Sequence, residues 1–275
     1  GDTSGAEALL AQAIAQDAGD LAARGELLAL KVATGRGSEP ATRTVMDALY
    51  DAYDAGKATS AEALVAVARA ALARGTSGAY HDANMVLAEA ERLPAPTGGP
   101  EQGFIVLDRV QLLRGAVFRE KYAASEAADT YNLILARDAW QPDALAGMAQ
   151  AHLEELRLAA AGEAAEAALQ TNPRHTDAHG VLARIALIEG RRDEAVTRAR
   201  SQILAIHPRH PVGLAVLAAA GLAADDTIAF TKARDEALAL SPSAVPFFLA
   251  LSDVLVSMHL YEQTGSVLED AVKRA

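Results

Sequence analysis

Apolar residues recur along the chain at the three- and four-residue spacing of amphipathic helices. After Pro211, one predicted helix carries Leu214, Leu217 and Ala218 on a single face. A polar break at residues 224–226 follows. The next predicted helix has its own apolar face, made of Ala229, Phe230, Ala233, Ala237 and Leu238. This spacing is typical of helices that pack one side against a core. The segment is therefore predicted to be a pair of helices joined by a short turn.

The same pair recurs, and a proline marks each recurrence. The prolines are Pro142, Pro173, Pro208 and Pro242. Their spacing is uneven but stays close to a repeat of about 34 residues. Each of the later three follows an alanine-rich second helix. A period of this size is typical of stacked helical hairpins, in which each repeat buries its apolar face against its neighbours. We therefore expect an all-α, right-handed superhelical solenoid.

The amino-terminal part shows the same organisation with less regular spacing. We predict one leading helix at about residues 6–16 and about seven hairpins in all. The earlier hairpins pair residues 20–34 with 41–55, 64–71 with 80–93, and 104–117 with 121–131. We treat residues 1–275 as one array, with irregular repeats over 6–141 and more regular repeats over 142–275. The proline- and glycine-rich stretch 93–103 is favoured as a long loop over a domain linker, because the helix period resumes after it.

Composition agrees with close helix packing and limits the kinds of partner. Hydrophobic residues make up 51% of the chain but aromatic residues only 4%, and cysteine is absent. Much of the hydrophobic share is alanine, a strong helix former and a small packing residue. The net charge of −11 argues against nucleic acid and anionic membranes as partners. Long uncharged apolar segments are absent, so no membrane span is predicted.

The chain begins at Gly1 rather than at methionine. We therefore expect that the native amino terminus has been removed. The sequence leaves open whether the protein is cytoplasmic or exported, and whether the native protein continues beyond residue 275.

The positions shared by the hairpins resemble the tetratricopeptide repeat, a helix-turn-helix module of about 34 residues. Gly190 with Ala195, and Tyr261 with Ala271, fit its turn and second-helix pattern. Tryptophan is absent from the first-helix aromatic site, and Leu156 and Asp225 stand where glycine is usual. The resemblance is strongest over residues 142–274.

This resemblance implies that the first helices line a concave face that binds a protein or peptide. Counted from the leucine–alanine pairs, the candidate binding residues are Gln150, Glu154, Arg184, Ile188, Val212, Ala215, Ala219, Leu222, Leu249, Asp253 and Val256. The carboxy-terminal part of this set is apolar and small, which favours a partner held by burial. The alternative is that a tightly wound superhelix buries the same residues against itself.

A weaker resemblance involves three short segments, residues 47–56, 80–84 and 120–127. They look like the amino-terminal repeat arrays of bacterial proteins that carry a carboxy-terminal zinc metallopeptidase-like domain. This resemblance implies a substrate-presenting or regulatory array whose partner is a carboxy-terminal domain of the same full-length protein. An α/α-toroid enzyme acting on sugars is a further alternative. It needs converging carboxylates, which the irregular placement of Glu154, Glu155, Glu163 and Glu166 does not favour.

Motifs of catalysis are absent from the sequence. It contains no G-x-x-x-x-G-K, G-x-G-x-x-G or G-x-S-x-G segment, so we expect neither enzymatic activity nor a cofactor. Histidines gather at the repeat junctions, where we interpret them as polar residues around helix starts rather than metal ligands. We expect Asp47, Asp51 and Asp54 to form a solvated acidic face. Trp140 is expected to cover a repeat junction.

Overall fold

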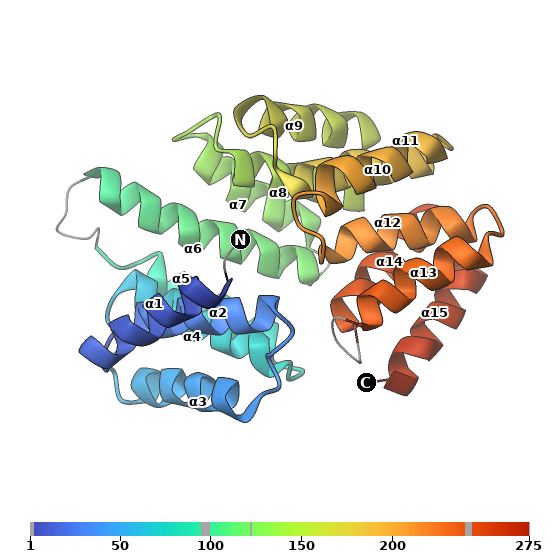
Figure 1. Ribbon diagram of the computed structural model, residues 1–275. Coiled ribbons are helices and arrows are strands. Elements are labelled where there is room, and N and C mark those ends of the chain that lie inside the picture. Colours follow the sequence, from blue (N-terminus) through green and yellow to red (C-terminus); the bar gives the residue numbers. More distant parts are fainter. Residues whose placement is uncertain (1–2, 95–99, 122, 240–243, 275) are drawn as a thin grey trace. The chain divides into compact units, whose positions relative to one another are not determined.

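The computed structural model describes residues 3–94, 100–121, 123–239 and 244–274. Within these ranges it contains fifteen α-helices, one π-helical turn and no strand (Figure 1). The predicted all-α helical-repeat solenoid is confirmed, with one leading helix followed by seven helix pairs. The chain divides into two compact units, Gly1–Ile134 and Leu135–Ala275.

The amino-terminal unit consists of a leading helix followed by helix pairs. Its helices are α1 (Thr3–Gln16), α2 (Leu21–Ala33), α3 (Pro40–Asp54), α4 (Ala61–Arg74), α5 (Ala79–Ala90), α6 (Pro100–Glu120) and α7 (Ala124–Leu135). The first helices α2, α4 and α6 pack in succession, and α3 and α5 pack on α4. Helix α6 begins at Pro100, inside the predicted loop 93–103. Residues 95–99 of that loop and Tyr122 lie outside the described residues.

Helix α4 forms the centre of the core of this unit. Its Leu64 and Val67 are completely buried against Leu49 of α3 and Leu87 of α5. On the α2 side the backbones approach closely at Gly25. A Cβ atom at this glycine would lie 2.3 Å from the Ala66 Cβ. Only a residue without a side chain fits this crossing of two first helices.

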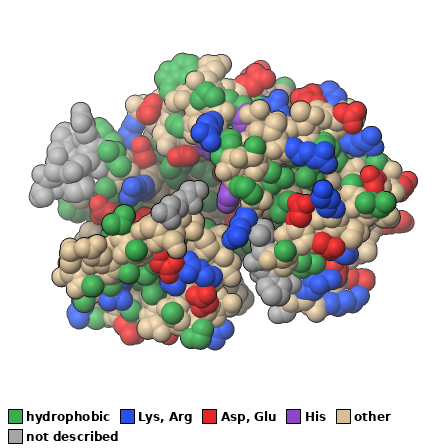
Figure 2. Space-filling view, in the orientation of Figure 1, with side chains coloured by type: hydrophobic (Ala, Val, Ile, Leu, Met, Phe, Trp, Pro, Cys, Tyr) green, Lys and Arg blue, Asp and Glu red, His purple; other side chains and the backbone are tan. Residues whose placement is uncertain are grey.

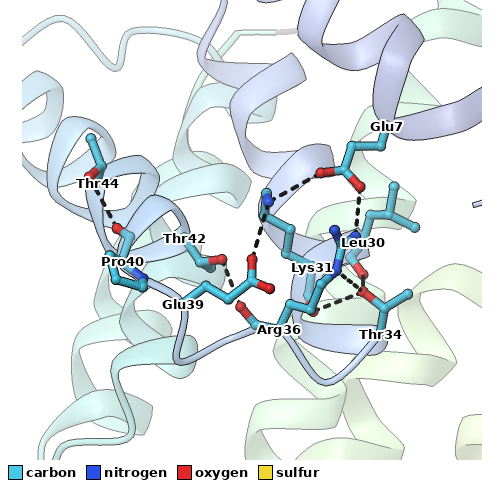
Figure 3. Close-up of polar contacts among 9 residues, drawn as sticks. All are labelled: Glu7, Leu30, Lys31, Thr34, Arg36, Glu39, Pro40, Thr42 and Thr44. Carbon is cyan, nitrogen blue, oxygen red and sulfur yellow. Dashed lines mark hydrogen bonds and ion pairs between the residues drawn. The ribbon is translucent and has the colours of Figure 1, made fainter. Parts of the chain in front are cut away.

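Helix α1 is attached to α2 through charged groups (Figure 3). It has no buried residue. The Lys31 ammonium of α2, only 10% exposed, lies 3.2 Å from Glu7 and 3.6 Å from Glu39. The Arg36 guanidinium lies 2.7 Å from the other Glu7 oxygen. These two cations lower the pKa of Glu7 through hydrogen bonds and charge. Glu7 therefore joins the leading helix to the first hairpin.

The carboxy-terminal unit contains four complete hairpins. Its helices are α8 (Pro142–Glu154), α9 (Leu158–Thr171), α10 (Thr176–Ile188), α11 (Arg192–Arg198) with the π-helical turn η1 (Ala199–Leu204), α12 (Pro211–Leu222), α13 (Thr227–Leu238), α14 (Val245–Ser257) and α15 (Tyr261–Arg274). The first helices α8, α10, α12 and α14 pack in succession, and each packs on its own second helix. Pro142 and Pro211 each occupy the first turn of a first helix, where a missing N–H is tolerated. Pro242 lies outside the described residues.

The turn between the two helices of each hairpin has the same backbone conformation in all four hairpins of this unit, although the prolines that mark the repeats are unevenly spaced. Leu156, Gly190, Asp225 and His259 have φ values of 56°, 77°, 54° and 59°. All four adopt the left-handed conformation, which favours glycine. The expectation that Leu156 and Asp225 occupy glycine positions is therefore correct. The sequence interval from Gly190 to Asp225 is one residue longer than the intervals from Leu156 to Gly190 and from Asp225 to His259. It contains η1, and a π-helical turn is a means of adding a residue to a helix.

Candidate functional site

The predicted binding residues all lie on the first helices of the carboxy-terminal unit. Glu154, Leu249, Asp253 and Val256 are exposed, and the others are partly exposed apart from two alanines. Ala215 and Ala219 are completely buried. The expectation that they line an accessible face is wrong, because neighbouring first helices pack closely enough to enclose such small side chains. For these two residues the alternative of self-burial is correct.

The burial of equivalent positions in successive first helices distinguishes a face that packs against neighbouring helices from a face that is accessible to solvent. At the twelfth residue of each helix, Leu153 and Leu187 are buried and Leu222 is half-buried, whereas Val256 is 46% exposed. The following position is accessible in three hairpins, where it is Glu154 of α8, Ile188 of α10 and Ala223 directly after α12. Val256 therefore belongs to a packing position that is uncovered in the last hairpin.

A hollow of about 670 Å³ lies at the turn side of the accessible face. Its apolar lining comes from the ends of three consecutive first helices, with Leu187 on α10, Ala223 after α12 and Met258 after α14. The rest comes from the turn before α11, namely Gly190, Arg191, Arg192, Asp193 and Glu194. The predicted residues Ile188 and Leu222 are adjacent in sequence to this lining.

The turn residues of the hollow carry both signs of charge. Arg191 pairs with Glu189 and Glu194, which raise the pKa of its guanidinium. Arg192 is held less closely, because its Nε lies 3.7 Å from the nearest Asp193 oxygen and its side chain is 51% exposed. The spacing of the helical faces does not identify Arg191, Arg192, Asp193 and Glu194 as site candidates. The glycine at Gly190 was the one available signal, since it marks a turn beside the face.

Charged side chains of both signs are mixed on the face drawn in Figure 2. In the amino-terminal unit, Asp47 of the acidic stripe pairs with Arg74 at 3.0 Å, and that guanidinium lies 3.7 Å from the centre of the Tyr50 ring. Asp51 and Asp54 are exposed. The stripe is therefore partly neutralised by a cation from α4.

Two histidines, His175 and His210, join successive first helices. His175 Nε2 lies 3.0 Å from Asp143 on α8, and His210 Nε2 lies 3.2 Å from Asp177 on α10. The hydrogen bond to Asp143 raises the pKa of His175 and lowers that of the carboxyl. These contacts agree with the interpretation of the histidines as polar residues around helix starts. Among the described residues, no group of three histidine, aspartate or glutamate side chains has an arrangement that could hold a metal ion.

Trp140 does not cover a junction as expected. Its residue surface is 58% exposed, and its backbone N–H donates to the Asp138 carboxylate in the turn before α8. The short polar turn orders the backbone and leaves the indole at the surface.

Among the helices that the structure describes, none has both the length and the apolar character that a membrane span requires.

Comparison with known proteins gives matches to structures only. No protein-family model and no curated protein matches the chain. A chain of the APC/C hetero-tetramer Cut9–Hcn1 superposes with a TM-score of 0.63 at 14% identity, covering 98% of this chain and 49% of that one. This chain thus spans about half the length of that relative.

Two smaller proteins match less closely. A tetratricopeptide repeat protein from Parabacteroides merdae has a TM-score of 0.49 at 14% identity, covering 84% of this chain and 91% of that one. The tetratricopeptide protein YrrB has a TM-score of 0.41 at 15% identity, covering 74% and 95%. The Cut9–Hcn1 superposition and the recurring hairpins with left-handed turn residues both indicate the same fold. The chain has the tetratricopeptide-repeat fold.

Proposed function

We propose that this chain is a non-catalytic interaction scaffold that binds a peptide segment of another protein. The observation that carries the proposal is the hollow formed where α10, α12 and α14 end. Its volume of about 670 Å³ is enough for a few side chains of a ligand. Of the sequence-based candidates, the proposed site keeps Ile188 and Leu222, which neighbour the lining in sequence, and it adds Ala223 and the turn before α11.

The residues that line the hollow indicate which chemical groups the bound peptide segment would carry. Leu187, Ala223 and Met258 offer an apolar floor, and methionine adapts its shape to different side chains. Arg191 is neutralised by two glutamates, so Arg192 is the cation best placed to meet a carboxylate of the ligand. The favoured partner is a segment with an apolar side chain followed by an acidic group.

Nothing in the hollow favours catalysis. Its carboxylates, Asp193 and Glu194, are exposed and lie beside arginines rather than beside a nucleophile. We therefore propose that the chain has no enzymatic activity of its own. The alternative of a presenting array in a larger metallopeptidase-like protein stays a hypothesis.

The experiment selects peptides from a displayed random library on the immobilised chain and measures their affinity by calorimetry. Ala223→Glu places a charge on the apolar floor and should weaken binding at least tenfold. Ala205→Glu is the matched control, because both alanines are exposed residues that follow a helical segment in right-handed backbone conformation. Failure to recover any peptide that distinguishes the two variants would overturn the proposal.

A further inference from the structure

The hollow lies beside Gly190, the one left-handed turn residue in the described part of the carboxy-terminal unit that has no side chain. The equivalent turn residues of the other three hairpins all carry side chains, and they are Leu156, Asp225 and His259. A Cβ atom built on Gly190 meets nothing within 4 Å. Open space therefore remains beside this turn, at a position where the other hairpins place a side chain.

A second small residue widens the same space. Ala223 directly follows α12, and its side chain lines the hollow. The equivalent residues of the other hairpins are larger, and they are Glu154, Ile188 and Ser257. Ile188, one repeat earlier, packs partly buried against the core. The methyl group at residue 223 thus leaves room that an isoleucine side chain would fill.

The floor of the hollow suits a flat apolar group. Leu187 is 4% exposed, and Met258 packs partly buried against the same core. The thioether of a methionine makes favourable contacts with aromatic rings, which an aliphatic side chain does not gain. The Gly190 backbone has no Cβ atom, so a ring can approach it closely. These walls therefore favour an aromatic ring over a branched aliphatic side chain.

The rim of the hollow supplies a cation for the face of such a ring. The Arg192 side chain is 51% exposed, and its Nε lies 3.7 Å from the nearest Asp193 oxygen. A guanidinium is attracted to the face of an aromatic ring and stacks on it. The chain already makes this contact in its amino-terminal unit, where the Arg74 guanidinium lies 3.7 Å from the centre of the Tyr50 ring. Arg192 is therefore placed to cover a ring that enters the hollow.

We propose that the hollow takes one aromatic side chain of the bound segment, and that Gly190 and Ala223 set this specificity by leaving room for the ring. This specificity rests on the proposed function and names the side chain that the segment carries. The ring lies on the floor made by Leu187 and Met258, under the Arg192 guanidinium. Stacking uses only the face of the guanidinium, so its N–H groups stay available for the acidic group that follows the ring.

The test compares two acetylated, carboxy-amidated tripeptides, glycine–tryptophan–glutamate and glycine–leucine–glutamate. The full chain is labelled with carbon-13 at the methyl groups of its four methionines, and Met258→Leu identifies the Met258 signal. We expect the tryptophan peptide to shift the Met258 signal saturably and to bind roughly fivefold tighter than the leucine peptide. Met85, which is 57% exposed in the amino-terminal unit, is the internal reference and should not shift.

Two variants test the residues that the specificity depends on. Ala223→Ile fills the hollow with the residue of the preceding repeat and should weaken the tryptophan peptide roughly fivefold. Ala205→Ile, at the exposed alanine after η1, is the matched control and should leave binding unchanged. Arg192→Gln should lower the preference for tryptophan over leucine, because the cation over the ring is lost.

Equal affinity of the two tripeptides for the wild-type chain would overturn the proposal, as would the lack of a saturable shift of the Met258 signal. Equal effects of Ala223→Ile and Ala205→Ile would also overturn it. If library peptides bind and Ala223→Glu weakens them while the tripeptides bind equally, the proposed function stands and the aromatic specificity fails. If the library yields no such peptide but the tryptophan peptide alone shifts Met258, the specificity stands and the scaffold function fails.

Discussion

The His175 imidazole bridges two consecutive hairpins, because its Nε2–H donates to the Asp143 carboxylate on α8 over 3.0 Å. One repeat later, His210 makes the same contact with Asp177. His175 also accepts a long hydrogen bond of 3.4 Å from the Ala178 N–H at the start of α10. Protonation at Nδ1 removes this weak acceptor but strengthens the charge-assisted bond to Asp143, which has the larger effect.

The first prediction concerns pH. The pKa of His175 is raised above its usual 6.5 by Asp143 and, through charge, by Asp177. The stabilisation of the folded protein by the His175–Asp143 contact is therefore fully present below pH 6.5. It is lost as pH rises through the raised pKa of His175. We expect Asp143→Asn to destabilise the protein by on the order of 0.5–1 kcal/mol at low pH, discounted for solvent screening. The measurement is the urea midpoint from about pH 5 to about pH 8.

The lowered pKa of Asp143 sets the acid limit of this effect. The contribution of the Asp143 carboxylate to the free energy of unfolding is present above the usual carboxyl pKa of 3.8. It is lost as pH falls through the lowered pKa of Asp143. Asp193→Asn, at a carboxylate whose side chain is 96% exposed, is the control. A constant difference between wild type and Asp143→Asn across the pH range would contradict the prediction.

The second prediction concerns the close crossing of α2 and α4. Gly25→Ala puts a methyl group 2.3 Å from the Ala66 Cβ, so the two helices must separate. Overpacking of this kind costs about 1–3 kcal/mol. Gly265→Ala is the matched control, since a Cβ atom there meets nothing within 4 Å. It should stabilise helix α15 by up to about 1 kcal/mol. Urea unfolding distinguishes the two, and equal effects would refute the close packing.

The third prediction concerns the left-handed turn residues. Leu156 adopts φ of 56° and is 48% exposed, so its side chain contributes little packing there. Leu156→Gly should raise the free energy of unfolding by about 1 kcal/mol, because glycine adopts this conformation without a steric penalty. Gly190→Ala should lower it, at a φ of 77°. Thermal melts of both variants check the prediction, and a destabilised Leu156→Gly would be the contrary result.

The fourth prediction concerns attachment of the leading helix. Glu7→Gln removes the carboxylate shared by Lys31 and Arg36, and no residue of α1 is fully buried. We expect faster hydrogen exchange of the α1 amides with little change in overall stability. Glu26→Gln is the control, because Glu26 pairs with Arg69 between α2 and α4. Equal exchange of α1 in both variants would show that the charges do not attach it.

Much of the fold was predictable from local signals. Apolar spacing and recurring prolines identify the hairpins, since the packing of each repeat depends on its immediate neighbours. The spacing of the glycine site predicts Leu156 and Asp225 as turn positions. Their conformation confirms this interpretation. The start of α6 at Pro100 was harder to predict, because a proline in the first turn resembles loop sequence.

The candidate site was predictable only in part. Ala215 and Ala219 were placed correctly on first helices, but sequence spacing does not show how closely the next helix approaches them. Arg192 and Met258 are not predictable from the sequence, because they line one hollow only when three turns stack. Leu249 and Val256 looked like binding-face residues. Comparison across the repeats assigns them to a packing position that the last hairpin leaves uncovered.

The most direct test of the scaffold account is photo-cross-linking from residue 223. A photoreactive amino acid replaces Ala223 in one variant and Ala205 in another, and each is irradiated with the peptide selected on the wild-type chain. The account predicts a cross-link from residue 223 at the end of α12 and none from residue 205. A cross-link from residue 205 with none from residue 223 would contradict the proposed binding surface.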